Sequence, residues 1–346
     1  MNTPLQFREV APSPLARFES GVCVVRGRMH IIGGHHGEEL DVTDEHWAYD
    51  PAADRWERFA DQPEPVSHYT CQVQDDRYVW YTGGYLGKHP GVAVTKTWRY
   101  DAETDAWEEF APLPKLRASL GCAILDGKMH VWGGLGEDRN TNFSDHWILD
   151  LENPTAWKPA APMPEGRAHF STGVVGGKAY SIGGHFYHDA PVQAKGQSCA
   201  DLDFMHRYDP ETDAWQRMND LPFRRSHIET ATMHYRGQLL VVGGRNNSPD
   251  ALPAHKRNSP LMIPLRAYRK VKRAFNPKTE ANMGRVSLDH VSLYDPPTDS
   301  WKTVGRIPKP LYACAAAVVG DTLIVTNGGL RAWKDASAHT WVASLV

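Results

Sequence analysis

In each of six similar segments of this chain a short β-rich run ends in the doublet Gly-Gly at the equivalent position, and this repetition constrains the fold more than any other feature. The first four doublets follow one another at intervals of fifty residues. A fixed period of about 40–50 residues is typical of repeat architectures, in which each repeat is one supersecondary unit. We therefore expect one array of similar units. The doublets are Gly33-Gly34, Gly83-Gly84, Gly133-Gly134, Gly183-Gly184, Gly243-Gly244 and Gly328-Gly329.

The units aligned on the doublets share a pattern of short β-rich runs. Each unit begins with a small-residue apolar stretch and a tight turn, continues with a run such as MHIIGG or LLVVGG, and then has a loop of variable length. An aromatic-Asp pair and a tryptophan follow the loop in most units. Short runs separated by turn signals predict four antiparallel strands per unit, which we name a to d from the centre outward. The tryptophans are Trp56, Trp107, Trp157, Trp215 and Trp301.

This pattern resembles the Kelch repeat family, and the resemblance covers nearly the whole chain in six units. It implies an all-β fold, a six-bladed Kelch-type β-propeller formed by residues 1–346 as a single domain. The sixth unit stops after its third strand, but residues 6–11 align with residues 55–60, which are strand d of the first unit. We therefore expect the N-terminal strand to close the last blade, with Phe7 in the tryptophan position.

The composition narrows the classes of partner. The net charge of −3 gives no general attraction to nucleic acid, and no apolar run is long enough to span a membrane. The N-terminus lacks the basic and apolar regions of a secretory signal. Four of the five cysteines lie in equivalent apolar segments, so we expect reduced, buried thiols in a cytoplasmic protein. These cysteines are Cys23, Cys71, Cys122 and Cys314.

The loop after the doublet is long in the fourth unit and longest in the fifth. In a propeller the d–a and b–c loops emerge on one face around the mouth of the axial channel, and long loops in compact folds are usually functional. We expect residues 246–288 to form a lid over this mouth. The segment is basic, and PLRAYRKVKRAFNP predicts a helix that docks on the rim as a cap. The alternatives are an arm that binds an acidic partner, nucleic acid or membrane, and a solvated insertion without function.

Histidine and arginine gather at the predicted channel mouth. The position at the start of strand a faces this mouth, and its occupants are Glu19, His68, Ser119, His169, His227 and Ala313. Placing His227 there assumes that the a–b hairpin of unit five is two residues longer; without that, Glu229 takes the place. The arginines just before this position are Arg17, Arg117, Arg167 and Arg225. The residues directly after the doublets are His35, Tyr85, Leu135, His185, Arg245 and Leu330.

Three interpretations suit such a mouth. His169, His185 and His227 belong to neighbouring units and predict a site for Fe, Zn or Cu. Without a metal, general acid–base catalysis is predicted for His68, His169, His227 and Glu19. The third interpretation is a polar rim without chemistry. The residues predicted to bind an anionic substrate are Arg117, Arg167, Arg245, His35 and Tyr85. Structural roles are predicted for His30, His46, His130, His146 and His290.

The Kelch family includes both protein-binding modules and enzymes, so the fold does not fix the function. The copper ligands of galactose oxidase-like proteins have no residue-by-residue match in this sequence. The iron-binding Glu-x3-Asp-x3-His run of plant specifier proteins corresponds to Asp138-x3-Asn142-x3-His146, which departs from it at two positions. Bacterial N-acetylneuraminate epimerase is a six-bladed Kelch enzyme of similar length.

We therefore predict an enzyme that acts on a small polar, anionic substrate in a lidded pocket at the channel mouth. The reaction classes are a metal-dependent oxidoreductase or lyase and a metal-free epimerase or isomerase. One alternative is a Kelch interaction module that binds an acidic protein partner. Another is a sugar-acid epimerase of the N-acetylneuraminate epimerase type.

Overall fold

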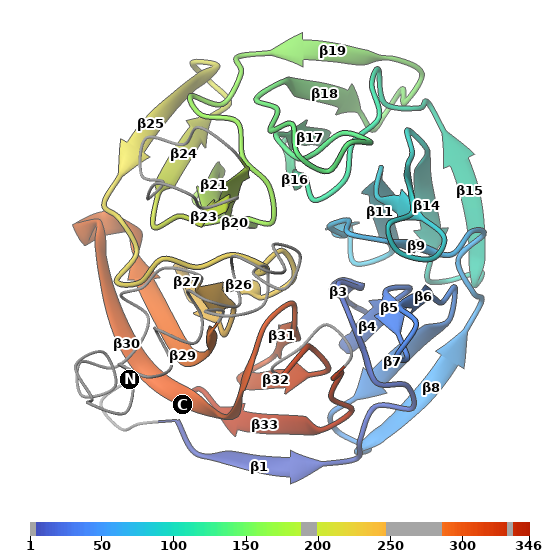
Figure 1. Ribbon diagram of the computed structural model, residues 1–346, viewed down its shortest axis with the longest axis vertical. Helices are drawn as coiled ribbons and strands as arrows, with labels where there is room; N and C mark the ends of the chain where they lie inside the picture. The colour runs from blue at the N-terminus through green and yellow to red at the C-terminus, as the bar shows by residue number, and fades with distance from the viewer. Residues whose placement is uncertain (1–4, 188–198, 247–285, 331–334) are drawn as a thin grey trace, which may run out of the picture.

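The computed structural model describes residues 5–187, 199–246, 286–330 and 335–346. In these ranges the chain forms a ring of six antiparallel sheets, the blades, around a central axis (Figure 1). The described ranges contain one short 3-10 helix, Pro296–Thr298, and no α-helix. The helix predicted within residues 246–288 lies outside them, as does most of the predicted lid, of which Asn246 and residues 286–288 belong to strands.

Each blade has four strands that lie side by side and follow one another outward from the axis, as the repeat pattern predicts. Blade one contains β3 (Gly21–Val25), β4 (Arg28–Ile32), β7 (His46–Asp50) and β8 (Arg55–Phe59). Blade two contains β10 (Gln72–Gln74), β11 (Tyr78–Thr82), β14 (Thr97–Asp101) and β15 (Ala106–Phe110). Blade three contains β16 (Gly121–Leu125), β17 (Lys128–Trp132), β18 (His146–Asp150) and β19 (Trp157–Ala160). Blade four contains β20 (Ser171–Val175), β21 (Lys178–Ile182), β24 (Met205–Asp209) and β25 (Ala214–Met218). Blade five contains β26 (Thr232–Tyr235), β27 (Gln238–Val242), β29 (Val286–Asp295) and β30 (Ser300–Leu311).

The N-terminal strand closes the sixth blade, which confirms the prediction from the truncated last repeat. This blade consists of β31 (Ala315–Val319), β32 (Thr322–Thr326), β33 (Thr340–Ser344) and β1 (Phe7–Val10). Strand β1 pairs antiparallel with β33, with Phe7 opposite Ala343 and Val10 opposite Thr340. Because β1 covers the edge of β33, the ring has no open seam between its first and last segments.

The repeat-linked tryptophans join each of blades one to five to the blade before it. In blade one, Trp56 Nε1 donates a hydrogen bond to the carbonyl oxygen of Ala11 (3.0 Å), while the Ala11 N–H donates to Asp54 (2.9 Å). The hydroxyl of Tyr49, from the aromatic-Asp pair, donates to the same Asp54 carboxylate (2.8 Å). Equivalent tryptophan bonds recur at Trp107, Trp157, Trp215 and Trp301. The conspicuous residues of the repeat therefore build the blade-to-blade contacts.

The Gly-Gly doublets allow the backbone to turn where there is no room for a side chain. Gly33 and Gly34 have φ of 61° and 97°, and a Cβ on Gly34 would lie 2.8 Å from the carbonyl oxygen of Phe18. In blade six the register differs from the sequence alignment by one residue. Asn327 and Gly328 adopt the doublet conformation there, with φ of 57° and 95°. Asn tolerates this left-handed region better than most residues, so the doublet needs only one glycine.

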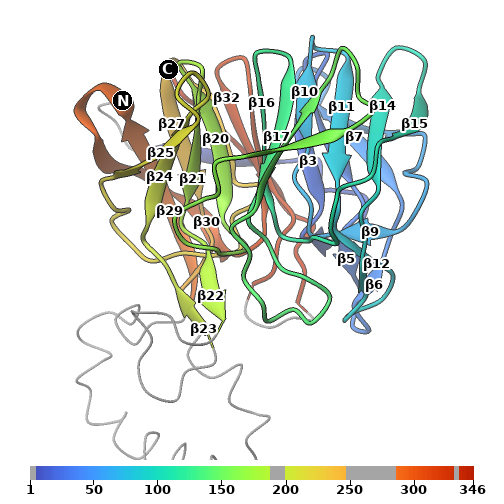
Figure 2. The ribbon, with the colours of Figure 1, turned by 90° about the horizontal axis from the view of Figure 1, so that it is seen from above.

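The d–a and b–c loops emerge on one face of the ring, as expected, and form small sheets there (Figure 2). The strands of these sheets are β2 (Arg17–Phe18), β5 (His35–His36) and β6 (Asp41–Val42); β9 (Val66–Ser67), β12 (Tyr85–Leu86) and β13 (Val92–Ala93); β22 (His185–Tyr187) and β23 (Cys199–Asp201). Strand β28 (Arg245–Asn246) pairs with the start of β29. Among the described residues, no helix is long and apolar enough to cross a membrane.

Removal of residues 1–12 should lower the melting temperature by several degrees. The deletion takes away β1, exposes the edge of β33 and removes Ala11, which Trp56 and Asp54 of blade one hold. Thermal unfolding followed by circular dichroism is the measurement, and a variant lacking only residues 1–4, in which β1 is intact, is the control. An identical melting temperature for the two truncations would show that the N-terminal strand does not close the ring.

Candidate functional site

Six residues at the starts of the innermost strands form a closed ring of backbone hydrogen bonds around the axis. Each N–H donates to the carbonyl oxygen of the equivalent residue in the preceding blade, over 2.7–3.4 Å. All six have a left-handed backbone, with φ between 47° and 61°. We call these residues the collar; they are Glu19, His68, Ser119, His169, His227 and Ala313. These are the six positions that the sequence alignment assigned to the channel mouth.

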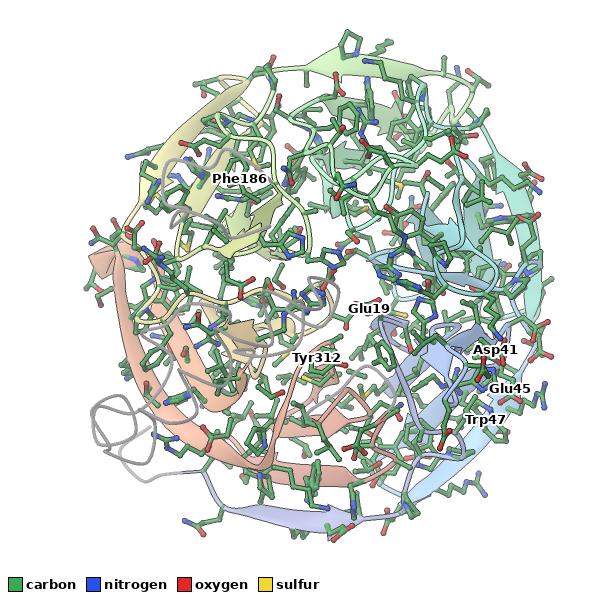
Figure 3. All side chains as sticks on the ribbon, in the orientation of Figure 1. Glu19, Asp41, Glu45, Trp47, Phe186 and Tyr312 are labelled. Atoms are coloured by element: carbon green, nitrogen blue, oxygen red, sulfur yellow. The ribbon has the colours of Figure 1, made fainter. Side chains whose placement is uncertain are left out.

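The collar brings its polar side chains together at the centre of the ring, where Figure 3 shows Glu19. Glu19, His68, His169 and His227 are all at most 4% exposed. A left-handed backbone is unfavourable for residues other than glycine, and it persists only when the surrounding structure imposes it. Such strain often accompanies functional positions, and here it coincides with buried polar side chains from several blades, so the collar is the first candidate for the site.

Blade five differs from the others between the collar and strand a. In blade one only Ser20 separates Glu19 from Gly21, which pairs with Ile32. In blade five residues 228–230 separate His227 from Ala231, whose carbonyl oxygen accepts from the N–H of Val242. The assignment of His227 is confirmed, but the two extra residues lie here and not in the a–b hairpin, which has the usual length. The insertion places Glu229 against the ring of His169.

Glu19 and His68 form a buried carboxyl–imidazole pair, with Nε2 of His68 in direct contact with Oε2 of Glu19. A chain of hydrogen bonds leads to this pair from the carbonyl oxygen of Leu40, which is 3.2 Å from Nδ1 of His35. Nε2 of His35 is 3.2 Å from Oγ of Ser67, and the same Oγ is 2.8 Å from Nδ1 of His68. Each group in the chain therefore has a neighbour on both sides.

The direction of every hydrogen bond in this series follows from the group at its start, the carbonyl oxygen of Leu40. A carbonyl oxygen only accepts, so Nδ1 of His35 carries a proton. Burial lowers the pKa of His35 to about 3 and that of His68 well below its ordinary value, so both rings are neutral at pH 7. Nε2 of His35 then accepts from Ser67, and Ser67 accepts from Nδ1 of His68. Nε2 of His68 is left without its own proton, so it shares one with the carboxyl group of Glu19.

A second carboxyl–imidazole pair lies beside the first. Nδ1 of His169 is 2.6 Å from Oε1 of Glu229, and both side chains are buried. Oγ of Ser119 is 3.2 Å from Nε2 and 3.4 Å from Nδ1 of the same ring, so it lies alongside the ring and not in line with one nitrogen. This position does not suit a serine nucleophile activated by His169, because activation requires a directed bond to one nitrogen.

The predicted metal-binding histidines are neighbours, but their rings do not converge on one point. The ring centroids of His169 and His185 are 4.6 Å apart and those of His185 and His227 are 5.4 Å apart. His169 and His227 stack face to face at 4.1 Å, with planes only 3° apart. The lone pairs of an imidazole lie in the ring plane and reach a metal at about 2.0–2.1 Å, so two parallel stacked rings cannot both bind one ion.

The described residues instead bring together ligand atoms of Glu19, His68 and His169, which all lie within 4.8 Å of one another. This group shares only His169 with the predicted set. One carboxylate oxygen and two imidazole nitrogens are a donor set that suits Zn or Fe with an open position for substrate. The direct contact between Glu19 and His68 means that an ion at this site would replace their shared proton.

Two of the arginines predicted to bind substrate form hydrogen bonds and ion pairs with residues of neighbouring strands and loops. Arg117 pairs with Asp145, and its guanidinium lies 3.5 Å from the ring centroid of Phe143. Arg167 donates to the carbonyl oxygen and the hydroxyl of Ser181, both at 3.0 Å. Burial lowers the pKa of Arg167 to about 9. These side chains tie the d–a loop to the neighbouring strands, a structural role that their position beside the mouth did not reveal.

The other predicted substrate-binding residues lie at the loop face of the collar. His35 is 5.2 Å from His68 between ring centroids, and Tyr85 is equally far from His68. Tyr85 donates its hydroxyl to the carbonyl oxygen of Gly136 (2.8 Å). Arg245 is 3% exposed in β28, next to collar residue His227 through its backbone bridge to Ser226. In blade six, Gly329 takes the place predicted for Leu330, because it bridges to Tyr312 as His35 pairs with Phe18.

Sequence reasoning missed two further groups near the collar. Arg139, from a loop of blade three, lies 3.6 Å from the ring centroid of Tyr85, and its charge contributes to the lowered pKa of His68. Ser67 and Ser226 each hydrogen-bond Nδ1 of the following histidine, at 2.8 and 2.9 Å. The repeated Ser-His dipeptide at the collar position was a signal for the serines, whereas nothing in the sequence pointed to Arg139.

Comparison with known proteins places the chain in a family. A model of the Attractin/LZTR1 β-propeller matches residues 2–249. The chain belongs to the Kelch-repeat β-propeller family. A Kelch repeat-containing protein of Arabidopsis thaliana is 23% identical over 94% of this chain and 71% of its own length. The solved structure of YjhT superposes with a TM-score of 0.70 over 96% of this chain and 95% of that chain, at 14% identity, which shows a common fold.

Other Kelch relatives match only in part. The Kelch-like protein terF of Aspergillus terreus is 25% identical over 68% of this chain, and the match spans 51% of terF. Kelch-like protein 35 of Mus musculus is 32% identical over 37% of this chain, and the match spans 21% of that protein. The matched segments span between 21% and 71% of these relatives, so their activities and partners do not transfer to this chain directly.

Four of the five histidines predicted to be structural form buried pairs between the strands of this Kelch propeller, whereas His290 is half-buried and lies 3.3 Å from the carboxylate of Asp289. In blade three, Nδ1 of His146 donates to the carbonyl oxygen of Ala161 (3.0 Å), which leaves Nε2 to accept from Nδ1 of His130 (3.1 Å). In blade one, His46 bonds in the same way to Ala60 (3.3 Å) and His30 (2.8 Å). Burial lowers the pKa of His30, His46 and His130 to about 3 and that of His146 to about 4.

Stability should therefore fall as the pH is lowered from about 6.5 toward 4. The unfolded chain takes up protons on these histidines in this range and the folded state does not, so acidification favours unfolding. His146→Gln should lower the free energy of unfolding at pH 7 but reduce its slope against pH by about one proton. Denaturant unfolding at several pH values measures both quantities, and an unchanged slope would contradict the neutral state of His146.

Proposed function

We propose that this Kelch propeller is an enzyme that transfers protons on a small polar substrate at the collar. One observation carries the proposal: ligand atoms of Glu19, His68 and His169, three buried collar residues from different blades, lie within 4.8 Å of one another. Proton transfer needs an acid and a base that can reach the same atom, about 2.6–3.2 Å from each. At this separation a single substrate atom can contact both His169 and the Glu19–His68 pair.

The hydrogen-bond directions assign the roles. Glu19 and His68 share one proton, so this pair is the general acid. His169 is the general base, because its Nδ1 side is occupied by Glu229, which orients the ring and stabilises the imidazolium that forms. Two titratable groups with opposite proton states at one site are the usual arrangement for acid–base chemistry at neutral pH. The reaction class that this pairing favours is epimerisation or isomerisation.

The metal-dependent form of the proposal uses the same side chains. Glu19, His68 and His169 would hold a Zn, Fe or Cu ion, which supplies Lewis-acid activation of a substrate oxygen. In that case Glu19 and His68 release their shared proton, and Ser67 and Glu229 orient the two rings. Orientation of a ligand histidine by its second nitrogen is a general requirement of such sites.

We also propose that the substrate is anionic, and this proposal depends on a cation at the mouth. Arg117 and Arg167 bond within their blades, so the cation that stays at the mouth from the predicted set is Arg245. A sugar-acid epimerase is one activity of this class. The alternative of an interaction module that binds an acidic partner depends on the basic residues of 246–288, which lie outside the described ranges. The four buried cysteines are free, which supports a cytoplasmic location.

Proton transfer can be tested before the substrate is known. In D2O, the protein should catalyse deuterium incorporation into the C–H bonds of at least one member of a panel of sugars, sugar acids and hydroxy acids, read by NMR. Glu19→Gln and His169→Asn should each slow this exchange by at least about a hundredfold, which is the usual contribution of a general acid or base. Glu211→Gln, on the outer turn of blade four, is the matched control.

Metal analysis of the same preparations, purified without a histidine tag, separates the two forms. Exchange that follows Fe, Zn or Cu content and disappears with a chelator supports the metal-dependent form. Exchange at full rate in metal-free protein supports the shared-proton form. Exchange that survives both Glu19→Gln and His169→Asn in folded protein would rule out the collar as the catalytic site.

A further inference from the structure

A cavity of about 260 Å³ follows the axis on the opposite side of the collar from the loop face. Its wall is made by the innermost strands β3, β26 and β31 and by residues around β10. It runs from His234, which is exposed, to Glu229, which is 7% exposed and in contact with collar residue His169. Its volume is slightly below the range of about 300–1,000 Å³ of drug-sized sites, so it suits a smaller molecule.

The deep end of this cavity offers hydrogen-bond acceptors. The hydroxyl of Thr70 donates its proton to the carbonyl oxygen of Leu120 (3.2 Å), and that of Thr230 donates to the carbonyl oxygen of Cys314 (3.0 Å). A hydroxyl whose proton is used in this way presents only lone pairs to other partners. With the carboxylate of Glu229 beside them, these groups favour a ligand that donates hydrogen bonds.

The charge of the lining excludes anions. Glu229 is the only Asp, Glu, Lys or Arg among the residues described around the cavity. Burial raises the pKa of the Cys71 thiol, so it adds no thiolate at neutral pH. An anionic ligand would bring a second acidic group next to the buried carboxyl group of Glu229, whose one ring contact, Nδ1 of His169, lies on the collar side, and this is unfavourable. Gln72 and His234, nearer the open end, supply groups that accept from or donate to a hydroxyl.

The carboxylate is present because of the two-residue insertion that is specific to blade five. In blade one a single small residue, Ser20, lies between the collar and strand a, whereas residues 228–230 fill this place in blade five. A blade-five segment as short as that of blade one would have no place for Glu229. Thr230 of the insertion also accepts a backbone bond from Ala316 on β31 (3.1 Å), which fixes the insertion against blade six. The acceptor-rich end is therefore a built feature of this propeller and not a property of the repeat.

We propose that the axial cavity binds a small neutral molecule with several hydroxyl groups, of the size of a short polyol, through Glu229, Thr70 and Thr230. The site opens on the face opposite the loops, so it is separate from the mouth where the sequence predicted an anionic substrate. It shares Glu229 with the proposed function, but its occupation requires no turnover. Binding and catalysis can therefore fail independently.

Erythritol and erythronate are matched probes, because they differ only by oxidation of one end to a carboxylate. Saturation-transfer NMR on the full chain should detect erythritol and not erythronate. Glu229→Gln should weaken erythritol binding by about ten- to a hundredfold, as expected for a hydrogen bond to a charged group, and should reduce the discrimination against erythronate. Glu211→Gln is again the control, and circular dichroism shows whether each variant is folded.

A soak of crystals of the wild-type protein in erythritol keeps the test independent of the variants. Electron density for erythritol against Glu229 and Thr230 supports the site. Density for water alone, equal binding of both probes, or unchanged affinity in folded Glu229→Gln would overturn it. Deuterium exchange that persists in wild-type protein while erythritol fails to bind would remove this site and leave the proposed function intact. Erythritol binding without deuterium exchange on any substrate would support this site and count against the proposed function.

Discussion

The closed ring of six backbone hydrogen bonds at the collar is the constraint on which the rest of the site depends. Each bond links two blades and contributes about 0.5–1.5 kcal/mol, whereas each left-handed residue costs about 1–2 kcal/mol. The collar therefore does not stabilise itself. The blades, joined by their tryptophan and aspartate contacts, hold it in place. Because one residue per blade must occupy this ring, six side chains from distant parts of the sequence are forced toward one axis.

The chemistry of the site follows from which residues occupy these enforced positions. Glu19 and His68 are neighbours in the ring and can share a proton without a flexible loop to bring them together. His169 comes from blade four, and the blade-five insertion supplies Glu229 to orient it. A scaffold that fixes both the proposed acid and the proposed base loses little entropy on reaching the reactive geometry, which is how binding sites gain precision.

The features that repeat could be predicted from the sequence, and those that depend on a single blade could not. The doublets, the tryptophans and the aligned position of Phe7 were enough for the ring, its closure and the six collar positions. The contacts of Arg117 with Asp145 and of Arg167 with Ser181 could not be predicted, because a position beside the mouth does not determine where a long side chain points. The one-residue shift at Gly328 was hidden, because Asn327 takes the doublet conformation in place of a glycine. The stacking of His169 on His227 depends on ring orientation, which no alignment contains.

The proposed acid of the site depends on the proton shared by Glu19 and His68, and neutron diffraction from crystals at neutral pH can locate this proton. We expect one proton between Oε2 of Glu19 and Nε2 of His68, a proton on Nδ1 of His68, and none on Nε2 of His35. A bare Nδ1 on His68, or an ion in place of the shared proton, would contradict the assignment of this pair as the acid of a metal-free site.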